Sequence, residues 1–287
     1  MKEASSISAH DLVSPTLRAR IATVRKASAR LTATEQDEDA LHDFRVALRR
    51  LRSVLRPLRD VYGKRSLGDL SADLKRVSDA TGALRDEEVL RETMRDLPLD
   101  PKTRTVVDAW LWGRKHTEER DRRAFVKTLV SKGKPSRLER SLDQLERLLA
   151  KRDARFGSDE PSAEALAKIA LERAFAEVDA SQGARDAEGL HRLRICFKRL
   201  RYVIELLRPI LGDDAETIAR GATKMQRRLG ELHDLDEALG QASRAEVLSV
   251  GVRATAVQAL EEARARSERK ATQALPEVLA SFGGEGS

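Results

Sequence analysis

The chain has 287 residues, of which 40% are hydrophobic and 35% are charged, so it can bury a core while carrying more charge than an average soluble protein. Only 3% are aromatic, and 16 Gly and 8 Pro are few for this length, which argues against sandwiches and barrels. We find no apolar run that could cross a bilayer and no signal peptide, and the single cysteine, Cys196, can form neither an internal disulfide nor a cysteine-based zinc cage. These features predict a helical protein of the cytoplasm.

Apolar residues recur with helical spacing along nearly the whole chain. An acidic stretch at 35–39, Pro98 with Pro101, and the segment around Gly133 interrupt this pattern. Nothing alternates with a period of two for long enough to be a strand. We therefore predict an all-α fold with a disordered tail at 283–287. The expected helices span residues 11–33, 40–62, 66–96 with a kink at Gly82, 102–132, 136–156, 161–181, 188–211, 213–246 and 251–281.

The charge balance gives the first indication of function. The chain has 54 Lys and Arg against 47 Asp and Glu, a net charge of +7, and 40 of the basic residues are arginines. The planar guanidinium matches the geometry of phosphate oxygens, whereas the ammonium of lysine acts as a point charge. What decides the interpretation is whether these arginines cluster.

An internal duplication brings basic residues into a repeated pattern. Residues 41–52 align without gaps on residues 190–201, with the shared pattern L-H-x-φ-R-φ-x-φ-[RK]-R-L-R, where φ is apolar. Further along, residues 82–86 match residues 230–234 as G-x-L-[RH]-D. Two copies of a four-helix unit explain both matches, and a pseudo-two-fold would bring the two motif helices near each other.

On each repeated helix the basic residues fall on one narrow side, apart from the apolar arc, at 100° per residue. We call these rows the first strip and the second strip. Stacked like charges destabilise a helix, and a bound polyanion would remove that repulsion. A solvated basic face, or arginines paired with acids on neighbouring helices, is the alternative explanation. The first strip comprises His42, Arg45, Arg49, Arg52 and Arg56, and the second comprises His191, Arg194, Lys198 and Arg201, with Glu205 in the fifth position.

The paired basic helices and the G-x-L-[RH]-D segments resemble the CHAD family, the conserved histidine α-helical domain, over about residues 10–280. The resemblance implies a domain at 10–282 made of two four-helix bundles, 10–133 and 136–282, related by a pseudo-two-fold around a basic central groove or pore. It also implies binding of inorganic polyphosphate, in some members on polyphosphate granules. This chain departs from strict repetition at His233, opposite Arg85. The expected polyphosphate-binding residues are His42, Arg45, Arg49, Arg50, Arg52, Arg56, Arg76, His191, Arg194, Lys198, Arg199, Arg201 and Lys224.

Nucleic-acid binding is the alternative function, because phosphate contacts also dominate the affinity of that class. Proteins that bind single strands add aromatic side chains on which bases stack. Here Phe44 and Phe197 lie on the apolar arcs of the motif helices, and Trp110 and Trp112 lie on a different helix. A phosphate site without stacking platforms favours a polymer without bases.

No motif indicates catalysis, a cofactor or a metal. His42 and His191 lack the partner of an H-E-x-x-H zinc site, and the chain has neither a P-loop nor a nucleophile elbow. Asp86 and Asp234 are expected to hold nearby basic side chains rather than a metal ion. We therefore predict a non-enzymatic polyphosphate-binding protein, whose oligomeric state the sequence does not indicate. The histidines outside the repeat that we expect at the surface are His10 and His116.

Overall fold

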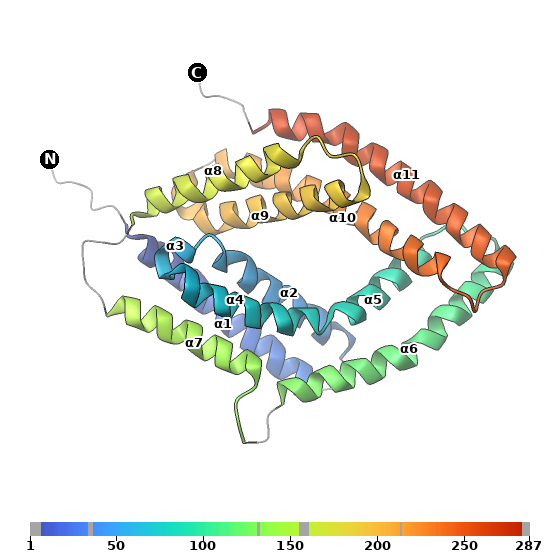
Figure 1. Ribbon diagram of the computed structural model, residues 1–287, viewed down its shortest axis with the longest axis horizontal. Helices are drawn as coiled ribbons and strands as arrows, with labels where there is room; N and C mark the ends of the chain where they lie inside the picture. The colour runs from blue at the N-terminus through green and yellow to red at the C-terminus, as the bar shows by residue number, and fades with distance from the viewer. Residues whose placement is uncertain (1–6, 34–36, 131–132, 155–160, 213, 283–287) are drawn as a thin grey trace. The chain divides into compact units, whose positions relative to one another are not determined.

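The prediction of an all-α fold is confirmed. The computed structural model describes residues 7–33, 37–130, 133–154, 161–212 and 214–282, so the tail expected to be disordered at 283–287 lies outside the described residues. Within those ranges the chain forms eleven α-helices and no strand, apart from one isolated bridge between Ser8 and Ser162. No described helix combines the length and the apolar character needed to span a bilayer. Figure 1 shows the helices α1 (Ala9–Ala33), α2 (Glu38–Leu55), α3 (Arg59–Tyr62), α4 (Lys64–Asp79), α5 (Gly82–Arg95), α6 (Pro101–Leu129), α7 (Arg137–Asp153), α8 (Ala163–Ser181), α9 (Ala187–Leu211), α10 (Asp214–Ser243) and α11 (Val250–Ala280).

The chain divides into two compact units that alternate along the sequence. Unit 1 spans Met1–Thr81, Arg123–Ala176 and Arg199–Glu216. Unit 2 spans Gly82–Arg122, Glu177–Lys198 and Thr217–Ser287. Helices α6, α8, α9 and α10 therefore each contribute residues to both units.

Four helices pack around the core of unit 1. Helices α2 and α7 each contact both α1 and α4, and the short helix α3 packs on α4 (Figure 1). Helix α7 follows the boundary expected at residues 133–136, and the grouping of the helices into repeats at 10–133 and 136–282 stays a prediction. The fully buried side chains of this core include Leu17, Ile21, Phe44, Leu48, Leu70, Leu74, Leu142 and Leu145.

Unit 2 has a core of its own, to which α5, the first part of α6, α10 and α11 contribute. The buried members from α5 and α6 are large side chains, whereas those from α10 and α11 are mostly alanines. This core holds Leu90, Met94, Leu97, Val107, Leu111, Ala238, Ala242, Ala256 and Leu260.

Two helices expected to be continuous are each interrupted. The helix expected at 40–62 ends at Leu55 and resumes as α3, because Pro57 has no N–H to donate and its ring clashes with the preceding turn. The helix expected at 66–96 is not merely kinked at Gly82 but divides there into α4 and α5. The hydroxyl of Thr81 donates to the backbone oxygen of Ser78 at 2.7 Å, satisfying a carbonyl at the end of α4.

The expectation that His10 lies at the surface is wrong. His10 is buried, with its Nδ1 2.7 Å from the Tyr62 hydroxyl and its Nε2 2.9 Å from an Asp153 carboxylate oxygen. Arg18 pairs with the other oxygen of Asp153 at 2.5 Å. These contacts join α1, α3 and α7 in unit 1, and both ring nitrogens of His10 have a partner, as a buried polar group requires. His116 is exposed, as expected.

Candidate functional site

Helix α2 carries the first strip. It is stabilised by an N-cap at its first turn and by packing of one face against the core. The Asp37 side chain accepts a hydrogen bond from the Ala40 N–H at 3.1 Å, the geometry of an N-cap. Arg30 of α1 donates to both carboxylate oxygens of Asp37, at 2.6 and 2.8 Å, and lowers the pKa of that carboxyl. The buried arc of α2, which includes Phe44 and Leu48, faces the core, and the first strip lies beside this arc.

The first strip combines exposed and partly buried cations. His42, Arg49 and Arg56 are exposed, whereas Arg45 and Arg52 are partly buried. Exposed cations can reach a ligand in solvent. Partly buried cations interact with it in a lower dielectric, where the electrostatic attraction between two charges is stronger. The strip is therefore a row of cations of graded accessibility on one helix.

The partly buried members differ in what they contact. Arg45 donates from Nη1 to the backbone oxygen of Thr81 at 3.3 Å. Arg52 makes no hydrogen bond or ion pair with any described residue. Burial lowers the pKa of its guanidinium, and the more distant charge of Asp79 partly opposes this. Arg52 is thus a half-buried cation whose hydrogen-bond donors have no acceptor within the described chain.

Other basic side chains of α2 also lack hydrogen-bond and ion-pair partners among the described residues. His42, Arg49 and Arg50 likewise make no side-chain hydrogen bond or ion pair with described residues. Arg50 lies off the strip and is exposed, as is its counterpart Arg199 on α9. Pairing with acids on neighbouring helices, the alternative explanation for these arginines, is therefore not seen for this part of α2.

The two peripheral positions have acidic partners. Arg76 of α4 pairs with Asp73 at 2.6 Å, and Lys224 of α10 pairs with Glu277 of α11 at 2.9 Å. Both cations are already neutralised within their own units. They are consequently weaker candidates than the residues of the strips.

Helix α9, which carries the second strip, begins at a tight cap. The Gly189 N–H donates to the Asp186 side chain at 2.9 Å, and the Leu190 N–H donates to the Asp186 backbone oxygen at the same distance. A Cβ on residue 189 would lie 2.5 Å from both the Ala184 Cβ and an Asp186 carboxylate oxygen. Glycine is therefore favoured at position 189, two residues before the strip starts at His191.

The second strip is more enclosed than the first and belongs to two units. His191, Arg194 and Lys198 are partly buried in unit 2, and Arg201 is partly buried in unit 1. The Arg201 guanidinium lies 4.5 Å from the centre of the Tyr202 ring, and its Nη1 lies 3.3 Å from a Glu205 oxygen. Glu205 thus compensates the strip at the position where the first copy has an arginine.

In unit 2, His191 of α9 meets His233 of α10. Their Nδ1 atoms are 3.2 Å apart and their ring centres 4.4 Å apart. Burial lowers the pKa of both imidazoles, with help from the charges of Arg194 and Lys198, and for His233 the pKa falls to about 4. The sequence motif did not include His233 among the expected site residues, although its alignment with Arg85 could have indicated it.

Asp234, the neighbour of His233, is affected by the charges of basic side chains from two helices. Burial raises the pKa of its carboxyl, and the charges of Arg85 and Arg194 oppose that effect. The charges of Glu92 and Glu231 add to the effect of burial. Among the described residues no group of three or more His, Cys, Asp or Glu side chains has the arrangement of a metal site.

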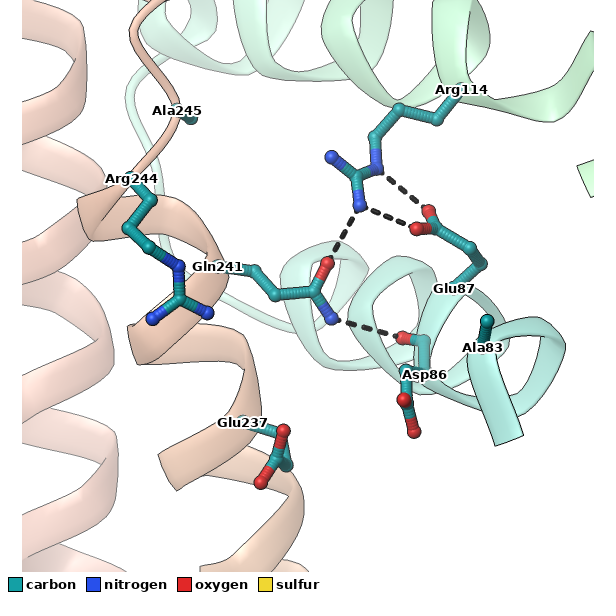
Figure 2. Close-up of a pocket in the computed structure, with 8 residues that line it drawn as sticks. All are labelled: Ala83, Asp86, Glu87, Arg114, Glu237, Gln241, Arg244 and Ala245. Atoms are coloured by element: carbon teal, nitrogen blue, oxygen red, sulfur yellow. Dashed lines mark hydrogen bonds and ion pairs between the residues drawn. The ribbon is translucent and has the colours of Figure 1, made fainter. Parts of the chain in front are cut away.

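A separate pocket of about 380 Å³ lies in unit 2, lined by residues of α5, α6, α10 and the turn after α10. Figure 2 shows Arg114 donating to both carboxylate oxygens of Glu87 and to the side-chain oxygen of Gln241. The hydrogen bond from Arg114 to Gln241 is 2.7 Å long. Gln241 in turn donates to the Asp86 backbone oxygen at 3.4 Å. The pocket carries both signs of charge, with Asp86, Glu87 and Glu237 against Arg114 and Arg244, and it contains no residue of either strip. It therefore does not have the uniform charge that a polyanion requires.

Comparison with known families and sequences identifies relatives of most of the chain. A family model described as the CHAD domain matches residues 16–243. The uncharacterized protein Rv2226 of Mycobacterium tuberculosis is 28% identical over 207 residues, which is 68% of this chain and 38% of that protein. The chain thus spans well under half the length of this curated relative.

Two solved structures share the fold. The crystal structure of the CHAD domain from the plant Ricinus communis matches with a TM-score of 0.75 and 20% identity, over 99% of this chain and 95% of that one. PptA from Streptomyces chartreusis matches with a TM-score of 0.67 and 16% identity, over 96% of this chain and 100% of that one. At these identities the likeness is one of fold.

Proposed function

Because the chain belongs to the CHAD domain family, we propose that it binds inorganic polyphosphate through the first and second strips and catalyses no reaction on it. The observation that carries the proposal is Arg52, a half-buried guanidinium with no hydrogen-bond or ion-pair partner among the described residues. A cation in that position lacks both the solvation of the surface and the compensation of a buried pair. A phosphate oxygen at Arg52 would supply the missing acceptor and the missing charge.

The other basic residues of the first strip provide further positions along α2 at which a phosphate could bind. From His42 to Arg52 is about 15 Å of helix axis at 1.5 Å per residue. A linear polymer with one negative charge on each internal phosphate can follow such a row, with each guanidinium donating charge-assisted hydrogen bonds to non-bridging oxygens. A single phosphate group cannot reach both ends.

The second strip supports the same ligand from another element. His191, Arg194 and Lys198 repeat the spacing of His42, Arg45 and Arg49 on a second helix. The duplication predicts that the two strips line one basic groove related by a pseudo-two-fold, and this arrangement is part of the proposal. A polymer that spans both strips would gain each further contact at high effective concentration.

The burial of aromatic rings favours polyphosphate over nucleic acid. On the helices that carry the strips, Phe44, Phe197 and Tyr202 are all buried, with at most 3% of their surface exposed. None of them can offer a face to an unstacked base, which is the contribution that single-strand binders add to phosphate contacts. The exposed ring of Trp112 is on α6, with Lys115 lying 5.6 Å from its centre.

The proposal assigns binding alone to these side chains, which supply hydrogen-bond donors and positive charge to phosphate oxygens. Attachment to the polymer would hold the protein on polyphosphate granules in the cytoplasm. Neither a cofactor nor a metal ion is needed for this role.

Calorimetric titration of the full chain with phosphates of increasing length tests the proposal. We expect affinity to rise from orthophosphate through triphosphate to chains of tens of phosphates, to level off when the strips are filled, and to fall steeply with salt because counterions are released. Single-stranded DNA with the same number of phosphates is the matched competitor and should bind more weakly.

Two outcomes would contradict separate parts of the proposal. Equal or tighter binding of DNA would replace polyphosphate by nucleic acid as the ligand. Equal affinity for triphosphate and for a chain of tens of phosphates would show that the strips do not act on one polymer.

A further inference from the structure

His191 and His233 form a pair that can hold only one proton between its facing atoms. Their Nδ1 atoms are 3.2 Å apart, a distance at which one nitrogen donates N–H and the other accepts. A proton on both Nδ1 atoms would point two N–H groups at each other and remove the hydrogen bond. In the neutral pair, therefore, one ring has its proton on Nδ1 and the other has its proton on Nε2.

This arrangement leaves the two outer nitrogens different. The ring that accepts at Nδ1 presents an Nε2–H donor, and the ring that donates at Nδ1 presents a bare Nε2 lone pair. A lone pair repels a phosphate oxygen, whereas an N–H binds it. One added proton, at the bare Nε2, converts the pair into an imidazolium–imidazole unit with a donor on each outer nitrogen.

Burial and the neighbouring cations keep the pair neutral in the free protein. Arg194 and Lys198 lie on the same helix as His191, and Asp234 follows His233 on α10, where the charges of Arg85 from α5 and Arg194 act on it. Burial and the two cations lower the pKa of both imidazoles, that of His233 to about 4. At neutral pH the pair consequently carries no net charge until an anion arrives.

We propose that His233 is a further binding residue of the second copy, and that the His191–His233 pair takes up one proton from solvent when a phosphate of the polymer binds beside Arg194 and Lys198. This inference rests on the proposed function. A bound polyanion favours the charged form of a nearby imidazole, so the anion supplies the energy for protonation. The first copy has Arg85 at the position aligned with His233, and a guanidinium is charged at all relevant pH values.

The sign of the pH effect follows from linkage. Between the pKa of the free pair and the higher pKa of the complex, the complex holds more protons than the free protein. Affinity therefore rises as the pH falls through this window. Coupling to one proton changes the affinity by up to about tenfold per pH unit.

Calorimetry in buffers of different ionisation enthalpy measures the proton uptake directly. The full chain is titrated at pH 7 and fixed ionic strength, in PIPES and in Tris, with sodium polyphosphate tens of phosphates long, so that the titrating end groups are a small share of the ligand. We expect the parent protein to take up as much as about one proton per chain through the pair. His233→Arg should still bind polyphosphate but take up distinctly less.

Three further variants separate the contributions of individual histidines. His233→Gln removes the shared proton without adding charge, and it serves if the arginine variant does not fold by circular dichroism. His42→Gln measures the share of the exposed histidine of the first strip. His116→Gln, which alters an exposed histidine on α6, should leave the uptake unchanged.

The outcomes distinguish this inference from the proposed function. Polyphosphate binding with no proton uptake in the parent protein, or an uptake unchanged in both His233 variants, overturns the role of the pair while leaving the proposed function intact. Absence of polyphosphate binding by the folded parent protein overturns the proposed function itself.

Discussion

The first and second strips carry similar cations but compensate them in different ways. Arg49 and Arg52, in the first strip, have no hydrogen-bond or ion-pair partner among the described residues. In the second strip, the charge of Arg194 acts on the carboxyl of Asp234 in unit 2, and Arg201 is paired with Glu205 in unit 1. The two copies thus have cations at the same positions, but they differ in the acidic residues that compensate these cations.

This difference suggests a division of roles between the copies. The four arginines of the first strip are charged at all relevant pH values, so the attraction that they contribute does not depend on protonation. The second strip includes the His191–His233 pair, whose charge can follow the ligand and the pH. Substitutions in the first strip should then reduce polyphosphate affinity the most. Substitutions in the second strip should change how that affinity depends on pH.

The largest effect is expected from reversing charge on the first strip. Arg49→Glu with Arg52→Glu should reduce polyphosphate affinity by at least about a hundredfold, because like charges placed across an interface cost several kcal/mol. Neither arginine makes a side-chain hydrogen bond or ion pair with described residues, so the fold should persist. Calorimetric titration gives the affinity, and circular dichroism confirms the helices.

A matched control separates the local effect from the change in net charge. Arg65→Glu with Arg269→Glu alters two exposed arginines, on α4 and α11, that also make no side-chain interaction with described residues. The net charge changes equally in the two double variants. If both lose affinity to the same degree, binding depends on overall charge and not on the first strip.

A smaller effect is expected when single cations are removed, and it should depend on whether the cation already has a partner. Arg52→Ala should cost about 1.5–3 kcal/mol of binding free energy, or roughly ten- to a hundredfold in affinity, the range for a hydrogen bond to a charged group. Arg76→Ala should cost much less, because Arg76 pairs with Asp73 at 2.6 Å. Equal losses in the two titrations would mean that ion pairing in the free protein does not rank the binding residues.

The helices were predictable because their buried apolar residues recur at regular intervals along the sequence. Leu48, Leu51 and Leu55 recur at helical spacing, and that period alone indicates a buried face. The same period continues through Leu58 and Val61, so the apolar pattern conceals the break that Pro57 imposes. Sequence periodicity therefore predicts which faces are buried better than it predicts where helices end.

Contacts between distant residues were not predictable in the same way. His10 meets Tyr62 and Asp153, which lie 52 and 143 residues away along the chain. No local pattern distinguishes such a histidine from one at the surface, because burial depends on what other helices bring to it. The pairing of His191 with His233 is similar, and only the register of the duplication pointed to position 233.

The smallest expected effect concerns the cost of the first strip to the free protein. Arg52 is half buried, its pKa is lowered by burial, and Arg45, Arg49 and Arg56 share its side of α2. Replacing an uncompensated buried charge by an apolar side chain of similar length removes both desolvation and repulsion. Arg52→Met should consequently stabilise the free protein by about 0.5–1 kcal/mol, a typical gain for a single favourable substitution.

Thermal unfolding followed by circular dichroism, without polyphosphate, measures this gain as a rise in Tm of about 2 °C. Arg76→Met is the matched control, since Arg76 is exposed and paired, and it should leave Tm unchanged or slightly lower. Added polyphosphate should reverse the order, because a ligand that binds only the folded state raises Tm most for the protein that binds it best. A parent protein more stable than Arg52→Met in the absence of ligand would mean that Arg52 supports the fold. The first strip would then be structural at the position where the proposed function requires a ligand.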